Sequence, residues 1–305
     1  MKRFLAMIAM AAFLATSGVV AMAYSGGPGV TADEAISKLK EGNQRFVAGA
    51  NVGPHQDAAR RHDTSVNGQH PIAVVLGCSD SRVPAEVVFD QGVGDIFVIR
   101  VAGNLAGPDE MGTVEYGVGH LGTPVVLVLG HTACGAVTAA VQNAKVHGSI
   151  PALINQIKPA VAKAKSWNPT ASGDDLLNKS IKANVWLTME NILRKSHEVR
   201  EFVKNGKVLV VGGIYDLTTG QVAWLGQHPE QGKILVAAEH KPVHVKPQPK
   251  PAAAPEGEAK ADEHGAAAPA AKPAAKSEGQ GELLAPAPEK APEKAPAKAA
   301  KNAHP

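Results

Sequence analysis

The feature that most constrains the fold is an uninterrupted apolar run that ends in a set of reactive side chains. The run from Ile72 to Gly77 is rich in β-branched residues, which is typical of a strand buried on both faces, as in a parallel sheet. Cys78, Asp80 and Arg82 follow it directly. Since α/β folds bind their ligands just beyond the carboxyl ends of parallel strands, this pattern predicts an α/β fold with a site at this position.

A second apolar run, from Pro124 to Gly130, also predicts a buried strand, and His131 and Cys134 follow it. Two strands thus deliver two thiols, one imidazole and the Asp80 carboxylate to loops that could share one end of a sheet. This is a ligand set suited to zinc. The alternative is a disulfide between the two cysteines, which is common in exported proteins. A disulfide would leave the carboxylate and the imidazole without an evident role, so we favour zinc.

The residues around both runs resemble the β-class carbonic anhydrases. The resemblance rests on Cys-Ser-Asp-Ser-Arg at 78–82 and Gly-His-Thr-Ala-Cys-Gly at 130–135, and it extends from about Thr31 to about Gly226. Shorter matching segments lie at 89–92, 100–104 and 215–217. The resemblance implies an α/β fold with a mostly parallel β-sheet, an antiparallel edge strand and flanking helices.

The resemblance also implies roles for the reactive residues. Cys78, His131 and Cys134 are expected to hold one Zn²⁺ per chain and to leave a fourth position for water, whose pKa zinc lowers to about 7. Asp80 and Arg82 are the expected catalytic residues, with Asp80 orienting the zinc-bound hydroxide while it pairs with Arg82. In a closed state, Asp80 itself becomes the fourth zinc ligand. The expected substrate pocket consists of Gln56, Phe97, Ala102, Tyr116 and Gly135.

The implied reaction is the reversible hydration of carbon dioxide to bicarbonate and a proton. A near alternative is the hydrolysis of carbonyl sulfide or carbon disulfide, which uses the same zinc site with a reshaped pocket. A third hypothesis is a non-catalytic envelope protein in which four residues permanently fill the coordination of zinc. A purely structural zinc site does not require an arginine that can draw Asp80 away, so Arg82 favours an enzyme.

The two ends of the chain differ in composition from its centre. Residues 1–23 combine a basic start, an apolar stretch and a closing Ala-Met-Ala, which predicts a secretory signal peptide and export to the periplasm or cell envelope. Residues 24–240 are expected to form the zinc domain. Residues 241–305 are rich in Ala, Pro, Lys and Glu and contain little apolar bulk, which predicts a disordered tail.

Charge and hydropathy limit the partners. The formal net charge of +3 favours neither nucleic acid nor a strongly charged substrate. After the signal peptide, no apolar stretch is long enough to span a bilayer. The expected partners are carbon dioxide, bicarbonate and further copies of this chain. The resemblance, the N-terminal helical segment and the glycine-rich segment at 113–121 together imply a homodimer or homotetramer.

Periodicity and capping residues predict the remaining elements. A helix from Thr31 to Ala48 opens with a capping box formed by Thr31 and Glu34. The stretch 49–69 is polar and is predicted as a loop that contains Gln56. Arg100, at the end of a predicted strand, is a candidate for structural pairing. Helices are predicted at 113–121, 135–145, 151–165 and 174–204, with a short one beginning near 84; strands are predicted at 95–101 and 207–213, with a hairpin-like return over 215–225.

Overall fold

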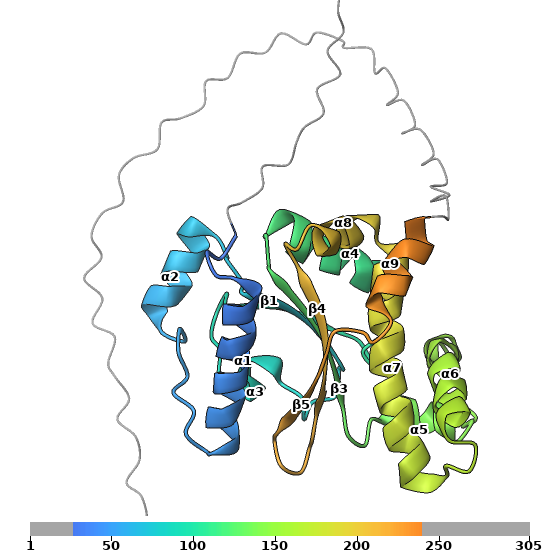
Figure 1. Ribbon diagram of the computed structural model, residues 1–305. Coiled ribbons are helices and arrows are strands. Elements are labelled where there is room, and N and C mark those ends of the chain that lie inside the picture. Colours follow the sequence, from blue (N-terminus) through green and yellow to red (C-terminus); the bar gives the residue numbers. More distant parts are fainter. Residues whose placement is uncertain (1–26, 240–305) are drawn as a thin grey trace, which may run out of the picture. The chain divides into compact units, whose positions relative to one another are not determined.

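The computed structural model describes residues 27–239, which are built around a five-stranded sheet with the order β2-β1-β3-β4-β5 (Figure 1). The first four strands are parallel, and β5 pairs antiparallel with β4 at one edge. The predicted fold class is therefore confirmed. The predicted signal peptide (1–23) and tail (241–305) lie outside the described residues. The strands are β1 (Ala73–Gly77), β2 (Ile96–Arg100), β3 (Val125–His131), β4 (Leu209–Tyr215) and β5 (Val222–Gly226).

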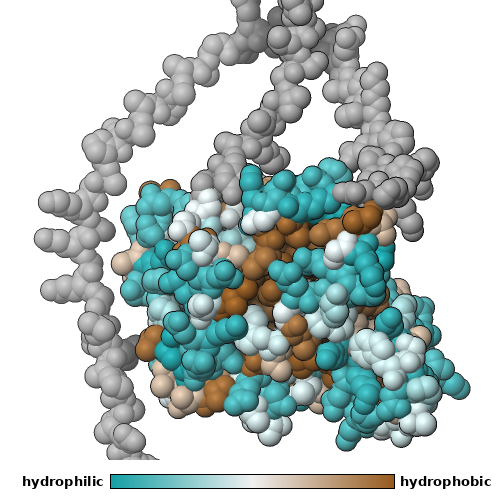
Figure 2. All heavy atoms as spheres, viewed as in Figure 1, coloured by the Kyte–Doolittle hydropathy of each residue, from teal (hydrophilic) through white to brown (hydrophobic). Residues whose placement is uncertain are grey.

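The central strands are buried on both faces because successive side chains of a strand point to opposite sides. Val74 of β1 belongs to one core, which α7 (Gly173–Lys195) covers. Its neighbour Val75 belongs to the other core, which α1 (Ala32–Val47) covers. Figure 2 shows the same face as Figure 1, with a mostly hydrophilic surface over α1 and α2 and apolar side chains gathered between α1 and the helices on the other side. Further helices are α2 (Ala58–Asn67), α3 (Ala85–Val88), α5 (Gly135–Val141) and α6 (Ile150–Trp167), of which α6 packs against α5 and α7.

The predicted N-terminal helix and its capping box are confirmed in α1. The hydroxyl of Thr31 accepts the backbone N–H of Glu34 at 3.3 Å, and the Glu34 carboxylate accepts the backbone N–H of Thr31 at 2.7 Å. Hydrogen bonds also join this helix to distant parts of the same chain. The buried Asn43 amide donates to the carbonyl of Val88 at 3.2 Å and to that of Gly220 at 2.9 Å.

The predicted continuous helix over 174–204 is wrong, because the structure has two helices there. After α7 ends, Ser196 adopts an extended conformation with φ −85° and ψ 112°, and α8 (His197–Lys204) follows. The Ser196 hydroxyl accepts the N–H of Val199 at 3.1 Å. The buried side chain of Arg200 donates to three backbone carbonyls between residues 193 and 196. The apolar spacing continues across the break, so periodicity alone did not reveal it.

Two helices were not predicted. The first, α2, lies inside the polar stretch 49–69; it buries none of its residues and therefore has no apolar periodicity. Its start is set by Asp57, whose carboxylate accepts the N–H of Arg60 at 2.7 Å. The second, α9 (Gln231–Glu239), follows the last strand and packs against α7 with Ile234 buried. No helix among residues 27–239 is long and apolar enough to cross a bilayer.

The glycine-rich segment is helical, but it begins earlier than predicted and changes its hydrogen bonding. An α-helix, α4 (Pro108–Glu115), passes directly into a π-helical turn, η1 (Tyr116–His120). A Cβ at Gly117 would stand 2.4 Å from Cγ2 of Val74. Only a hydrogen therefore fits against β1 at Gly117.

Candidate metal centre

Three side chains with metal-binding atoms meet where β1 and β3 end. Cys78 directly follows β1, His131 is the last residue of β3, and Cys134 immediately precedes α5. Because β1 and β3 are neighbouring parallel strands, their carboxyl ends lie side by side. The candidate ligand atoms lie within 4.8 Å of one another, and all three side chains are buried. The three residues predicted as zinc ligands thus lie together within one chain.

The imidazole of His131 offers one nitrogen to this cluster. Its Nδ1 lies 2.9 Å from the carbonyl oxygen of Thr132; since a carbonyl can only accept, Nδ1 carries the hydrogen. The unprotonated Nε2 is buried and has no hydrogen-bond partner within the described part of the chain. A buried acceptor without a partner is costly. A histidine whose other nitrogen donates to a backbone carbonyl is the usual form of a metal ligand, so this ring fits a metal site.

The two thiols lie close enough to interact with each other. The pKa of Cys78 is lowered, first because its sulfur accepts a hydrogen bond from Cys134, and further by the backbone N–H groups of Gly103 at 3.3 Å and Asp80 at 3.4 Å. The pKa of Cys134 is raised, because it donates that bond and is buried. The surroundings therefore favour a thiolate at Cys78, and the thiolate is the form of cysteine that binds metals.

Asp80 stands beside the cluster and is held by Arg82. The guanidinium donates from Nε to Oδ1 at 2.9 Å and from Nη2 to Oδ2 at 2.7 Å, which is a two-point pair. This pair is the main cause of the lowered pKa of Asp80 and of the raised pKa of Arg82. Oδ2 of Asp80 also lies 3.9 Å from Nε2 of His131. The carboxylate is therefore ionised, directed towards the cluster and paired with the arginine.

Two of the residues predicted to line the substrate pocket border the cluster. Ala102 lies two positions beyond β2 and precedes Gly103, whose N–H points at the Cys78 sulfur. Gly135 opens α5 directly after Cys134, and nothing lies within 4 Å of the position that a Cβ would occupy. Gly135 therefore leaves open space beside Cys134.

Phe97 and Tyr116 lie together but away from the cluster of their own chain. Their ring centroids are 5.9 Å apart. Phe97 pairs with Val74 in the register of β2 and β1, and Val74 precedes Cys78 by four residues, or about 13 Å of strand. Tyr116 is 45% exposed. Within one chain, these two aromatic rings do not reach the candidate ligands.

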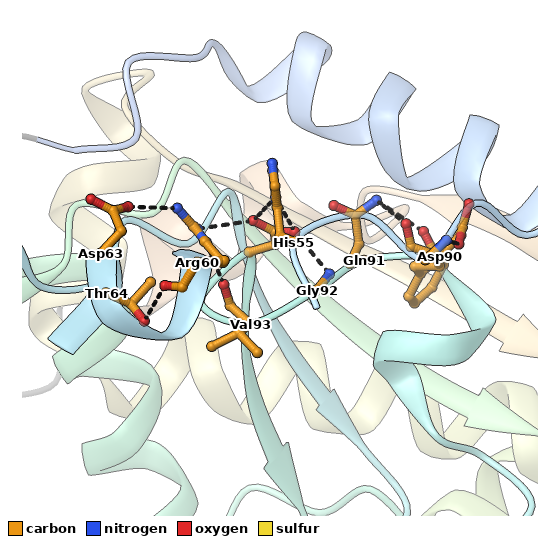
Figure 3. Close-up of polar contacts among 11 residues, drawn as sticks. His55, Arg60, Asp63, Thr64, Asp90, Gln91, Gly92 and Val93 are labelled. Carbon is orange, nitrogen blue, oxygen red and sulfur yellow. Dashed lines mark hydrogen bonds and ion pairs between the residues drawn. The ribbon is translucent and has the colours of Figure 1, made fainter. Parts of the chain in front are cut away.

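Gln56 lies in an exposed loop, and its neighbour His55 and the nearby Arg60 are shown in Figure 3. This loop is anchored by Asp95, which directly precedes β2 and accepts hydrogen bonds from His55 Nδ1 at 2.8 Å and Arg60 Nη2 at 3.1 Å. The candidate ligands lie at the carboxyl ends of the parallel strands, whereas Asp95 lies at their amino ends. The structure therefore does not bring Gln56 to the metal centre of the same chain.

The loop that carries Cys78 and Asp80 is held by Arg100, the last residue of β2. Its Nε donates to the carbonyl of Cys78 at 2.9 Å and its Nη2 to the carbonyl of Asp80 at 2.5 Å. The sequence indicated only an unspecified pairing for this arginine. The role depends on β2 being the neighbour of β1, with Arg100 opposite Gly77, and strand order cannot be read from the residues around Arg100.

The sequence has recognisable relatives. The sequence model of the family described as Carbonic anhydrase matches residues 73–222. Carbonic anhydrase 2 of Mycobacterium tuberculosis is 36% identical over 188 residues, which cover 60% of this chain and 87% of that protein. The match spans most of that relative, and the residues matched by the family model include both segments that carry the candidate ligands.

Comparison with solved structures points to the same family. The β-carbonic anhydrase CafA of Aspergillus fumigatus superposes with a TM-score of 0.55 at 27% identity, covering 68% of this chain and 95% of that one. This chain belongs to the β-class carbonic anhydrases. The same fold occurs in the two tetrameric β-carbonic anhydrases of Sordaria macrospora, for which the matching chain gives a TM-score of 0.51 at 24% identity and covers 55% of this chain and 87% of that one. The expected family is confirmed.

Proposed function

We propose that this β-class carbonic anhydrase catalyses the reversible hydration of carbon dioxide to bicarbonate and a proton. The observation that carries the proposal is the buried cluster of Cys78, His131 and Cys134 with the Asp80–Arg82 pair beside it. Membership of the family supports the same reaction. The paired arginine favours an active enzyme over a closed, purely structural zinc site.

The residues of the cluster suit a zinc ion. Two thiols and one otherwise unpartnered imidazole nitrogen are the ligand types that zinc prefers, and three protein ligands leave one position open. When bound, zinc lowers the pKa of a coordinated water from about 15.7 to about 7 and so supplies a nucleophile at neutral pH. Cys78, His131 and Cys134 would hold the ion.

Asp80 and Arg82 have distinct roles in this proposal. The ionised carboxylate of Asp80 can only accept hydrogen bonds, and its Oδ2 lies 3.9 Å from the ligand nitrogen of His131. In this proposal, Asp80 accepts the hydrogen of the attacking oxygen and directs the lone pair of that oxygen towards carbon dioxide. Arg82 fixes the carboxylate plane at two points and keeps it ionised.

The test combines zinc analysis with stopped-flow carbon dioxide hydration. Cys78→Ser and His131→Ala should lose both bound zinc and activity, because each removes one ligand. The matched control is His197→Ala, which removes an exposed imidazole from the start of α8. A protein purified without reductant that contains a Cys78–Cys134 disulfide and no zinc would refute the proposal. If the protein turns over carbonyl sulfide faster than carbon dioxide, carbonyl sulfide is its substrate and the proposed reaction is wrong.

We also propose that the substrate pocket is completed by a second copy of the chain. Phe97, Tyr116 and Gln56 are predicted pocket residues that lie away from the cluster of their own chain. A homodimer or homotetramer could bring these residues to the site of a neighbour. The relatives from Sordaria macrospora are tetrameric, which supports this arrangement.

We further propose that the protein is exported to the periplasm or cell envelope. The support is the composition of residues 1–23, which ends in Ala-Met-Ala. Cleavage after Ala23 would give a mature protein beginning at Tyr24. Mass spectrometry of the protein from fractionated cells tests this, and an intact Met1 in the cytoplasmic fraction would contradict it.

A further inference from the structure

The loop that covers the Cys78 sulfur has an unusual backbone. Gly103 donates its N–H to Sγ at 3.3 Å and has φ +79°, and the next residue, Asn104, has φ +45°. Two consecutive residues with positive φ are uncommon, and the second is not a glycine. A Cβ at Gly103 would stand 2.8 Å from Cδ1 of Ile157. The loop therefore has a conformation that is costly and tightly enclosed, and it needs support from elsewhere.

The support comes from α7, about eighty positions further along the chain. The Asn184 amide donates from Nδ2 to the carbonyl of Gly103 at 2.7 Å. One helical turn later, the Thr188 hydroxyl donates to the carbonyl of Asn104 at 3.0 Å. Asn184 is fully buried and Thr188 is 1% exposed. Two side chains on one face of α7 thus hold the two carbonyls of the turn.

Packing alone does not account for an asparagine at position 184. Its neighbours Val185 and Met189 belong to the apolar core, and burying an amide there is unfavourable unless its polar atoms are satisfied. The Oδ1 of Asn184 has no hydrogen-bond partner within the described residues. The bond from Nδ2 to Gly103 is therefore the interaction that explains this side chain.

We propose that Asn184 is a positioning residue of the metal centre, which acts through the backbone of Gly103 on the Cys78 sulfur. The inference rests on the proposed zinc site. Holding the Gly103 carbonyl fixes the orientation of this residue, and with it the direction of the N–H that meets the sulfur. Removing a group that orients a metal ligand without touching the metal typically lowers metal affinity by about 10–100-fold.

The test compares two variants that each break one buried hydrogen bond. Asn184→Leu keeps the side-chain shape and removes the donor to Gly103. The matched control is Thr123→Val, which removes a buried hydroxyl that donates to the Gly117 carbonyl at 2.7 Å, at the amino end of β3. Zinc affinity is measured by chelator competition. The thiolate-to-metal charge-transfer band of the cobalt-substituted protein reports the sulfur environment.

Asn184→Leu should lower zinc affinity about tenfold and shift the charge-transfer band. Thr123→Val should lower the thermal unfolding midpoint about as much as Asn184→Leu does, but it should leave the zinc affinity and the charge-transfer band unchanged. If the two variants have the same zinc affinity and the same charge-transfer band, the inference is overturned. If Asn184→Leu does not fold, Asn184→Ser provides the same comparison with a smaller side chain. A wild-type protein that binds no zinc would instead refute the proposed metal site, so the two failures are distinguishable.

Discussion

Replacing Asp90 by asparagine should destabilise the protein by about 3 kcal/mol without emptying the metal centre. The Asp90 side chain, labelled in Figure 3, is 2% exposed, and its hydrogen bonds hold the start of the loop that contains Gln56. Its Oδ2 accepts Arg45 Nε at 2.5 Å and the Val52 N–H at 3.1 Å, while Oδ1 accepts the Gly53 N–H at 2.9 Å. These contacts fasten an otherwise exposed loop to the body of the chain.

The magnitude follows from the geometry of the replacement. Oδ1 also lies 3.5 Å from Nδ2 of Asn51, so each carboxylate oxygen faces two donors. Whichever way the new amide turns, its NH₂ group meets two donors that have lost their acceptor. At about 1.5 kcal/mol for each partly exposed donor the sum is about 3 kcal/mol. Asp90 has φ +46°, a conformation that asparagine tolerates well, so the backbone adds little to the cost.

The stability difference between wild type and Asp90→Asn should also depend on pH. Burial alone would raise the pKa of Asp90, but hydrogen bonds from Arg45, Gly53 and Val52 outweigh it, and the net pKa is lowered. A carboxylate with a lowered folded-state pKa stabilises the protein above its unfolded pKa of about 3.9 and loses that contribution as the pH falls through the folded value. The difference between wild type and Asp90→Asn should be complete at neutral pH and shrink below about pH 4.

The assay is urea and thermal unfolding of both proteins across this pH range, with zinc content measured in parallel. A loss of about 3 kcal/mol corresponds to a thermal midpoint lower by about 6–12 °C in a domain of this size. The control is Asp63→Asn, because that carboxylate is half exposed and its pair with Arg60 is at the surface. If the free energy of unfolding of Asp90→Asn lies within about 0.5 kcal/mol of the wild-type value at neutral pH, these hydrogen bonds do not hold the loop.

Three further outcomes are expected. Arg82→Ala should retain zinc but lose about 10–100-fold in hydration rate, because Asp80 loses the partner that orients it; wild-type rates at every pH would contradict the proposed roles of the pair. Truncation after Pro242 should leave thermal stability and turnover nearly unchanged, since the removed residues contain little apolar bulk to bury; a large loss of either would contradict this expectation. Light scattering should show a dimer or tetramer under assay conditions, and a fully active monomer at nanomolar concentration would refute a pocket shared between subunits.

The residues of the candidate metal centre could be predicted from the sequence because they follow directly on predicted strands. Each candidate ligand lies within a few residues of a strand end, at Cys78 after β1 and at His131 and Cys134 around the end of β3. The apolar, β-branched composition of these strands predicts burial in a parallel sheet, and such a sheet collects the chemistry at its carboxyl edge. Capping residues are equally local, which is why the start of α1 at Thr31 was predicted correctly.

Tertiary structure decided what depends on partners distant in the sequence. The break at Ser196 and the helix over 58–67 are set by hydrogen bonds of single polar side chains, which leave no periodic pattern. The distance of Phe97 from the cluster of its own chain follows from strand register. The roles of Arg100 and Asn184 exist only because strand order and helix packing bring them to loop carbonyls 20 to 81 residues away. A local pattern reveals the type of a side chain, whereas the packed fold determines which atom it meets.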